Sequence, residues 1–197
     1  MRQINPTIRS IVEEACKKET NRYGYGIWSH HVVLVVKYGK LLAQKLEADP
    51  EIVQIAALLH DYASIKAESL TSEHHLHSAQ EADKILRSLS YPEDTITAVK
   101  QCIVSHRGSI DIEKQTVEAV CLASADAIAH IDQIPSLFYL VFVQHQMEID
   151  EGTAWVRAKL ERSWNKLCPE GKEMIKEKYE AAKKIVQQVK LPNGEQW

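Results

Sequence analysis

The stretch Ala56-Ala57-Leu58-Leu59-His60-Asp61 ends a short apolar segment with an imidazole and a carboxylate side by side. Both groups are good ligands for divalent metal ions. Neighbouring residues of a regular helix point about 100° apart, so they bind one ion together best where the helix ends and the chain turns. A histidine at a helix end beside a solvated aspartate is also common. Partners elsewhere in the sequence must therefore decide between the two interpretations.

The composition indicates one globular protein of modest size. The chain has 197 residues, 45% of them hydrophobic, and can bury a sizeable core in one domain. Its formal net charge is −3, so the sequence has no excess of basic residues for binding nucleic acid. Its beginning lacks an apolar signal core, and the longest apolar runs, 32–36 and 137–143, are too short to span a membrane. Four cysteines without a Cys-x-x-Cys pair argue against a zinc ribbon and for reduced thiols in the cytoplasm.

Apolar residues recur at helical spacing along most of the chain, and only seven glycines and six prolines interrupt it. The segment 31–36 is rich in β-branched residues, which makes a strand an alternative there. We favour a helix, because the apolar pattern continues to Leu46 and no turn signal precedes Asp49-Pro50. The sequence therefore predicts an all-α fold.

The expected helix boundaries follow from capping residues and breaks. Ser29 and Ser72 are expected N-caps, and Asp49 is expected to cap a helix that begins with proline. Residues 62–71 are expected to form a loop, and the tail 191–197 to be loose. The first expected helix spans 7–19, and later ones follow Ser29 as far as Leu46 and run from Pro50 into His60-Asp61. Further helices are expected from Ser72 to about Leu89, from Tyr91-Pro92 to a stop at Gly108, over about 115–132, and in two or three segments within 135–190.

Four further residues are candidate partners of the His-Asp pair. Taken alone, His31 near the start of an apolar helix is explained as a satisfied core or capping residue, and His74 in a first turn as an exposed one. His106 continues an inward-facing apolar stripe, and Asp126 lies among small apolar residues, where an unpaired carboxylate is costly to bury. Together these residues are best explained by a shared metal site, since the cores of helical bundles commonly hold metals between facing helices.

The order His31, His60-Asp61, Asp126 resembles the signature of the HD-domain superfamily of metal-dependent phosphohydrolases. The stretch ending in His60-Asp61 is very close to that family's defining motif. The segments around His74 and around His106 resemble the branch of the family that adds two histidines for a second metal. The resemblance covers about residues 25–132.

This resemblance implies an HD-domain helical bundle with additional C-terminal helices. The implied organisation is an N-terminal helix and loop at 1–24, a metal-binding core at 25–132, and C-terminal helices at 133–197 packed on the same domain. The resemblance further implies one or two divalent ions per chain, with Fe, Mn, Zn, Mg and Ni all open. The implied ligands are His31, His60, Asp61 and Asp126 for the first ion and His74 and His106 for the second, with Asp61 able to bridge.

The same residue chemistry supports hydrolysis, because a metal lowers the pKa of bound water to near neutrality. Asp61 is the candidate catalytic carboxylate at the metal site. Lys66 and Arg107 are the candidate cations that would bind the oxygens of the substrate. Solvation of Lys66, and a contact of Arg107 with the end of its helix, are the simpler alternatives. His75 and His130 are candidates to contact the metal ligands without binding the metal themselves. The alternative is that both are ordinary helix-end histidines.

The leading hypothesis is metal-dependent hydrolysis of a phosphoester in a nucleotide or another small phosphorylated metabolite. A di-iron oxygenase on the same ligand set and a non-catalytic nucleotide-binding module are the alternatives. We expect a small phosphorylated partner, and neither nucleic acid nor a membrane. The aromatic-rich run 137–143 is open to two interpretations, a homodimer face or part of the core, and we favour the core.

Overall fold

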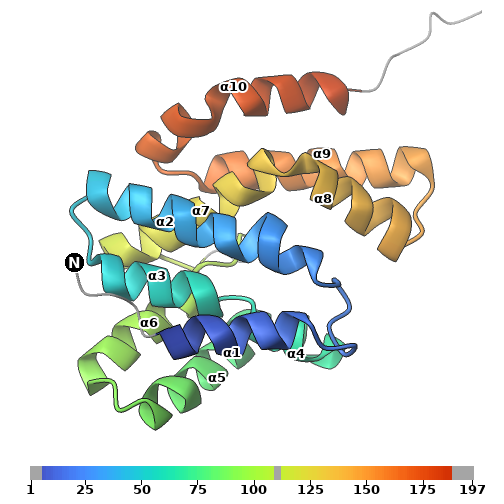
Figure 1. The fold of residues 1–197 in the computed structure, drawn as a ribbon. Helices are drawn as coiled ribbons and strands as arrows, with labels where there is room; N and C mark the ends of the chain where they lie inside the picture. The colour runs from blue at the N-terminus through green and yellow to red at the C-terminus, as the bar shows by residue number, and fades with distance from the viewer. Residues whose placement is uncertain (1–5, 109–111, 188–197) are drawn as a thin grey trace, which may run out of the picture.

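The computed structural model describes residues 6–108 and 112–187, and every regular element in these residues is helical (Figure 1). The all-α prediction is confirmed, including a helix rather than a strand over 33–45. The tail 191–197 lies outside the described residues. The elements are α1 Pro6–Cys16, the π-helix η1 Trp28–Val32, α2 Val33–Lys45, α3 Pro50–Leu59, α4 Tyr62–Lys66, the 3₁₀ turn η2 Glu68–Leu70, α5 His74–Ser88, α6 Glu93–Ser105, α7 Val117–Asp132, α8 Ile134–Phe138, the π-helix η3 Tyr139–Gln144, α9 Ile149–Lys166 and α10 Pro169–Ile185.

The centre of the bundle is α7, which packs against α2 and α3 (Figure 1). Alanines at 119, 123, 125, 127 and 129 of α7 are all buried, and their small side chains let the neighbouring helices approach closely. Gly39 serves the same purpose on α2, because a Cβ at that position would lie 3.0 Å from Cγ1 of Val53 on α3. The end of α3, where His60 and Asp61 follow, is therefore deep in the protein.

Two groups of helices cover this centre on opposite sides. The α5–α6 pair packs against α3, while α9 and α10 pack against α7, with α10 lying over α9 at the top of Figure 1. α10 buries residues at helical spacing and exposes a charged outer face. In the run 137–143, Leu137 and Val141 are buried while Tyr139 and Val143 are about half exposed, so the run is only partly core.

The expected cap at Ser29 was wrong. The chain is already helical at Ile27, with φ −61° and ψ −33°, so Ser29 lies inside the wider π-helical turn η1. Its hydroxyl lies 2.8 Å from Nδ1 of His30 instead of capping a helix. Single π-helical turns often occur at functional sites, and this one carries His31.

The loop expected at 62–71 was also wrong. This segment forms α4 and η2, because Ala63 and Ile65 are buried against neighbouring helices and tertiary packing stabilises short helices. Ser72 is not an N-cap either. The following helix begins at His74, and no side chain caps its first turn.

Asp49 does cap α3 as predicted, and a substitution there tests this local rule. Its carboxylate accepts hydrogen bonds from the amides of Glu51 at 2.8 Å and Ile52 at 3.4 Å. We expect Asp49→Ala to lower the free energy of unfolding by about 1 kcal/mol, measured by urea denaturation. Ser72→Ala is the matched control and should change it by less than about 0.5 kcal/mol. Equal losses in the two variants would contradict the capping role of Asp49.

Candidate metal centre

Five helical elements bring their polar side chains to one point inside the bundle. η1 supplies one histidine, the end of α3 supplies the His-Asp pair, the start of α5 and the end of α6 each supply a histidine, and α7 supplies an aspartate. The side chains that meet are those of His31, His60, Asp61, His74, His106 and Asp126.

Four of these residues form a first group. Nε2 of His31 and Nε2 of His60 lie 3.2 Å apart. Oδ2 of Asp61 is 3.3 Å from Nε2 of His60 and 3.5 Å from Nε2 of His31. Oδ1 of Asp126 is 3.4 Å from Nε2 of His31 and 3.9 Å from that of His60. Atoms bound to one ion at about 2.1 Å lie about 3.0 Å apart at a right angle and about 3.4 Å apart in a tetrahedron, so these spacings suit one ion.

A second group shares Asp61. Nε2 of His74 and Nε2 of His106 lie 3.3 Å apart. The other carboxylate oxygen of Asp61, Oδ1, is 3.5 Å from the first nitrogen and 3.7 Å from the second. Asp61 therefore offers one oxygen to each group, which is the arrangement a bridging ligand between two ions requires.

The hydrogen bonds of three imidazoles fix which nitrogen faces the centre. Nδ1 of His60 donates to the carbonyl of Ala57 at 2.9 Å, and Nδ1 of His74 donates to that of Thr71 at 3.0 Å. Nδ1 of His106 donates to the carbonyl of Ile103 at 2.5 Å. A carbonyl can only accept, so in the neutral rings the Nε2 lone pair points inward. Metal-binding histidines are commonly held this way, and the donor set therefore fits divalent cations.

The charges of the cluster favour a cation at the same point. Burial opposes charge on His60, but the carboxylate of Asp61 outweighs it and raises the pKa of His60 to about 9. Burial likewise opposes ionisation of Asp61, yet the surrounding imidazoles hold its pKa well below the usual range. Burial lowers the pKa of His106 to about 4. Without an ion the cluster thus retains a proton, which a divalent ion would displace on binding.

His130 lies directly beside the first group. Burial and the charge of Lys159 lower the pKa of His130 to about 3, so its ring is neutral. Its Nε2 is 3.1 Å from Oδ1 of Asp126, and its ring stacks on that of His31 with centroids 4.6 Å apart. His31, Asp126 and His130 form a further group with the spacing of metal ligands.

The structure separates the other residues that the sequence suggested. Lys66 pairs with Glu81 at 2.7 Å and does not line the cavity. Arg107 does line the cavity, but its guanidinium also donates to the carbonyl of Ser72. His75 is buried with Nδ1 3.5 Å from that guanidinium, and it stands behind His74 rather than among the ligands.

A residue that sequence reasoning missed is Lys166 on α9. Its ammonium donates both to Oδ2 of Asp126 and, at 3.1 Å, to the carbonyl of His106. Burial opposes ionisation of Asp126, but Lys166 holds the pKa of that carboxyl well below its usual range. No local pattern signals this contact, because it depends on where α9 packs.

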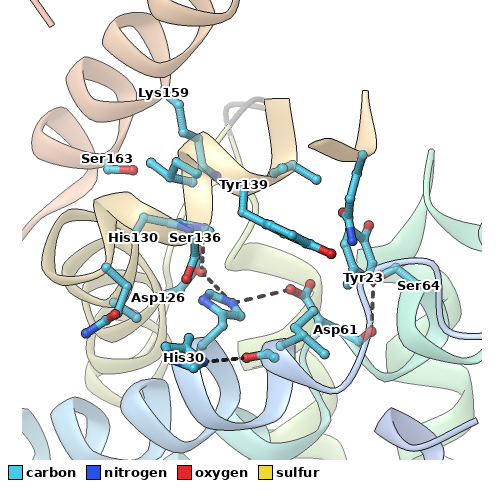
Figure 2. A pocket seen from close by; sticks show the side chains of 18 of the residues that line it. Tyr23, His30, Asp61, Ser64, Asp126, His130, Ser136, Tyr139, Lys159 and Ser163 are labelled. Atoms are coloured by element: carbon cyan, nitrogen blue, oxygen red, sulfur yellow. Dashed lines mark hydrogen bonds and ion pairs between the residues drawn. The ribbon is translucent and has the colours of Figure 1, made fainter. Parts of the chain in front are cut away.

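The cluster lies at the floor of a cavity of about 750 Å³ (Figure 2). Its walls combine aromatic side chains, including Tyr23, Tyr139 and Trp155, with charged ones. In Figure 2 the ring of Tyr139 reaches across the space above Asp61. Although the chain has a net charge of −3, the described lining includes four lysine and arginine side chains and only two carboxylates, those of Asp61 and Asp126. The cavity therefore suits an anionic ligand.

These features define a helical protein with histidine and aspartate ligands arranged for divalent ions beneath an anion-accepting cavity. The HD domain family model matches residues 28–131, just over half of the chain. The chain belongs to the HD domain family, and the resemblance seen in the sequence is confirmed.

Solved structures share the fold across most of the chain. Bacillus subtilis YpgQ in complex with ADP has a TM-score of 0.70 and 20% identity, covering 92% of this chain and 93% of that one. A predicted HD superfamily hydrolase from an uncultured Thermotogales bacterium has a TM-score of 0.55 and 22% identity, covering 81% and 84%. At these identities the comparison establishes the fold alone.

The curated relatives match only over a shared segment. Ribonuclease Y of Alkaliphilus metalliredigens is 30% identical over 112 residues, covering 57% of this chain and 21% of its own. Ribonuclease Y of Thermoanaerobacter pseudethanolicus is 32% identical over 107 residues, covering 54% and 19%. The chain thus spans about a fifth of the length of these relatives.

All four cysteines are buried and unpaired, so the expectation of free thiols agrees with the structure. Among the described helices, none has both the length and the apolar character needed to cross a bilayer.

Proposed function

We propose that this protein is a metal-dependent phosphohydrolase that acts on a nucleotide or another small phosphorylated metabolite. The observation that carries the proposal is the pair of ligand groups sharing Asp61 at the floor of a cation-rich cavity. His31, His60, Asp61 and Asp126 would hold one ion, and Asp61, His74 and His106 a second. Bound there, divalent ions supply Lewis acidity and lower the pKa of a coordinated water, which is the chemistry that phosphoester hydrolysis needs.

The residues of the chain contribute position and charge to this reaction. Asp61 fixes the two groups relative to each other, and the backbone carbonyls behind the imidazoles keep the Nε2 atoms aimed at the centre. The buried floor limits access of bulk water, while the cationic side chains of the wall balance the negative charge of a phosphoryl group.

The cavity supports a small substrate. A volume of about 750 Å³ is in the range of sites for small ligands, and its aromatic walls suit a flat ring such as a nucleobase. The ADP held by the structurally similar Bacillus subtilis protein is in keeping with a nucleotide. The name of the Ribonuclease Y relatives makes RNA a second candidate substrate, although the chain spans only about a fifth of them and has a net charge of −3.

The test is a turnover screen on protein loaded separately with Mn, Fe, Zn, Mg and Ni. The panel holds nucleoside mono-, di- and triphosphates, other small phosphoesters and a single-stranded RNA, and release of phosphate, pyrophosphate or nucleotides is measured. We expect metal-dependent turnover of a small phosphorylated compound that chelation abolishes. Turnover of RNA alone would replace the substrate class, and oxygen uptake by the iron form without hydrolysis would replace the reaction. A metal-loaded protein inactive on the whole panel would contradict the proposal.

A further inference from the structure

One face of α9 forms a wall of the cavity beside the metal centre. Trp155, Lys159, Arg162, Ser163 and Lys166 line the cavity, and their spacing of three and four residues places them on the same side of the helix. This helix lies beyond the segment 28–131 that matches the HD domain family. Its cationic face is therefore a feature of this chain outside the matched core.

The three cations of this face are not equivalent. Lys166 is committed to Asp126 and to the carbonyl of His106. Within the described chain, the side chain of Lys159 forms no hydrogen bond and no ion pair within 4.0 Å, and the same holds for the side chain of Arg162. Lys159 and Arg162 are thus the cations of the wall that remain available to a ligand.

The surroundings of Lys159 make an anionic ligand favourable. The side chain of Lys159 extends from α9 toward His130 and Ser136 (Figure 2). Burial lowers the pKa of Lys159 to about 8, and the neighbouring positive charge of Lys166 contributes, while Asp126 opposes the effect. A half-buried ammonium without a close partner has lost part of its hydration, and a phosphoryl oxygen would compensate that loss by a charge-assisted hydrogen bond.

We propose that Lys159, assisted by Arg162, binds the anionic oxygens of the substrate and makes α9 the wall that recognises its phosphoryl group. The role rests on the proposed phosphohydrolase function and assigns to α9 the contact that the sequence suggested for Lys66. A phosphoryl group held at the metal centre would lie within electrostatic range of Lys159, because Asp61 and Asp126 are within that range, and Arg162 lines the same cavity. Lys159 binds and orients the substrate, and no bond is made or broken at its nitrogen.

The experiment measures binding of inorganic phosphate to the Mn-loaded protein by calorimetry, with the Mn content of each sample determined alongside. Lys159→Met removes the charge and keeps the length of the side chain, whereas Lys159→Arg keeps the charge. Lys176→Met, on the exposed face of α10, is the matched control. We expect Lys159→Met to weaken phosphate binding by about 10- to 100-fold at unchanged Mn content. The phosphate affinity of Lys159→Arg should stay within about threefold of that of wild type. The phosphate affinity of Lys176→Met should equal that of wild type.

The outcomes of this experiment separate the role of Lys159 from the hydrolase function. Equal phosphate affinity in wild type and Lys159→Met overturns the role of Lys159 and leaves metal-dependent hydrolysis standing. Loss of Mn together with phosphate affinity also overturns it, because Lys159 would then support the metal centre instead of the substrate. If Lys159→Met weakens phosphate binding as expected but the wild type is inactive in the turnover screen, the binding role stands and the hydrolase function fails.

Discussion

Replacing Asp61 with asparagine is expected to lower metal-dependent turnover by about 1000-fold or more and to leave less than one tightly bound ion per chain. The two oxygens of Asp61 face different ligand groups, 3.3–3.5 Å from the first pair of imidazoles and 3.5–3.7 Å from the second. An amide is neutral and offers only one good ligand oxygen. The substitution therefore weakens both groups at once while keeping the shape of the side chain.

The measurement is turnover and metal content on the same preparations. Asp94→Asn is the matched control, because Asp94 is exposed in the first turn of α6 and is not one of the proposed ligands. We expect this control to keep wild-type metal content and turnover within about twofold. An Asp61→Asn protein that keeps both ions and stays within tenfold of wild-type turnover would show that the carboxylate does not bridge the groups.

Replacing Lys166 with methionine is expected to lower the free energy of unfolding of the metal-free protein by about 3 kcal/mol. The side chains of Lys166 and Asp126 are each only 7% exposed, and removal of the lysine leaves a buried carboxylate without its cation. The loss should be smaller in the Mn-loaded protein, because ions bound at Asp126 compensate its charge. The variant thus tests whether α9 is electrostatically tied to the metal centre.

The control for this variant is a second lysine–aspartate pair between the C-terminal helices and α7. Lys178 on α10 pairs with Asp132; the lysine side chain is 60% exposed, whereas the aspartate is 7% exposed and also has the hydroxyl of Tyr38 as a partner. We expect Lys178→Met to cost less than about 1 kcal/mol in either metal state, because the ammonium lies largely in solvent and Asp132 keeps Tyr38 as a partner. Urea denaturation with and without Mn gives all four values. Equal losses for Lys166→Met and Lys178→Met would remove the special role of the buried pair.

The parts of the fold that the sequence predicted are those governed by local rules. The Asp49 cap, the ends of α3 and α7 and the helical state of 33–45 follow from capping and apolar spacing within a few residues. The predictions at Ser29 and over 62–71 failed where tertiary packing decides, in the π-helical turn η1 and the short helix α4.

The candidate site divides in the same way. The six proposed ligands lie on helices whose ends and inward faces can be read from local patterns, and the structure brings all six together. Of the two cations that the sequence suggested, Arg107 lines the cavity and Lys66 does not, and Lys159 and Lys166 come from a helix about a hundred residues beyond Lys66. Where α9 packs on α7 depends on long-range contacts that no local spacing encodes.

The most direct test of a two-ion centre is elemental analysis of protein purified without chelator, for wild type and His106→Ala. His106 belongs only to the second group, so we expect about two ions per chain in wild type and about one in the variant. His145→Ala, at an exposed histidine beside Arg22, should keep both ions. One ion in both wild type and His106→Ala, or none after reconstitution with Mn, Fe or Zn, would contradict the two-ion centre.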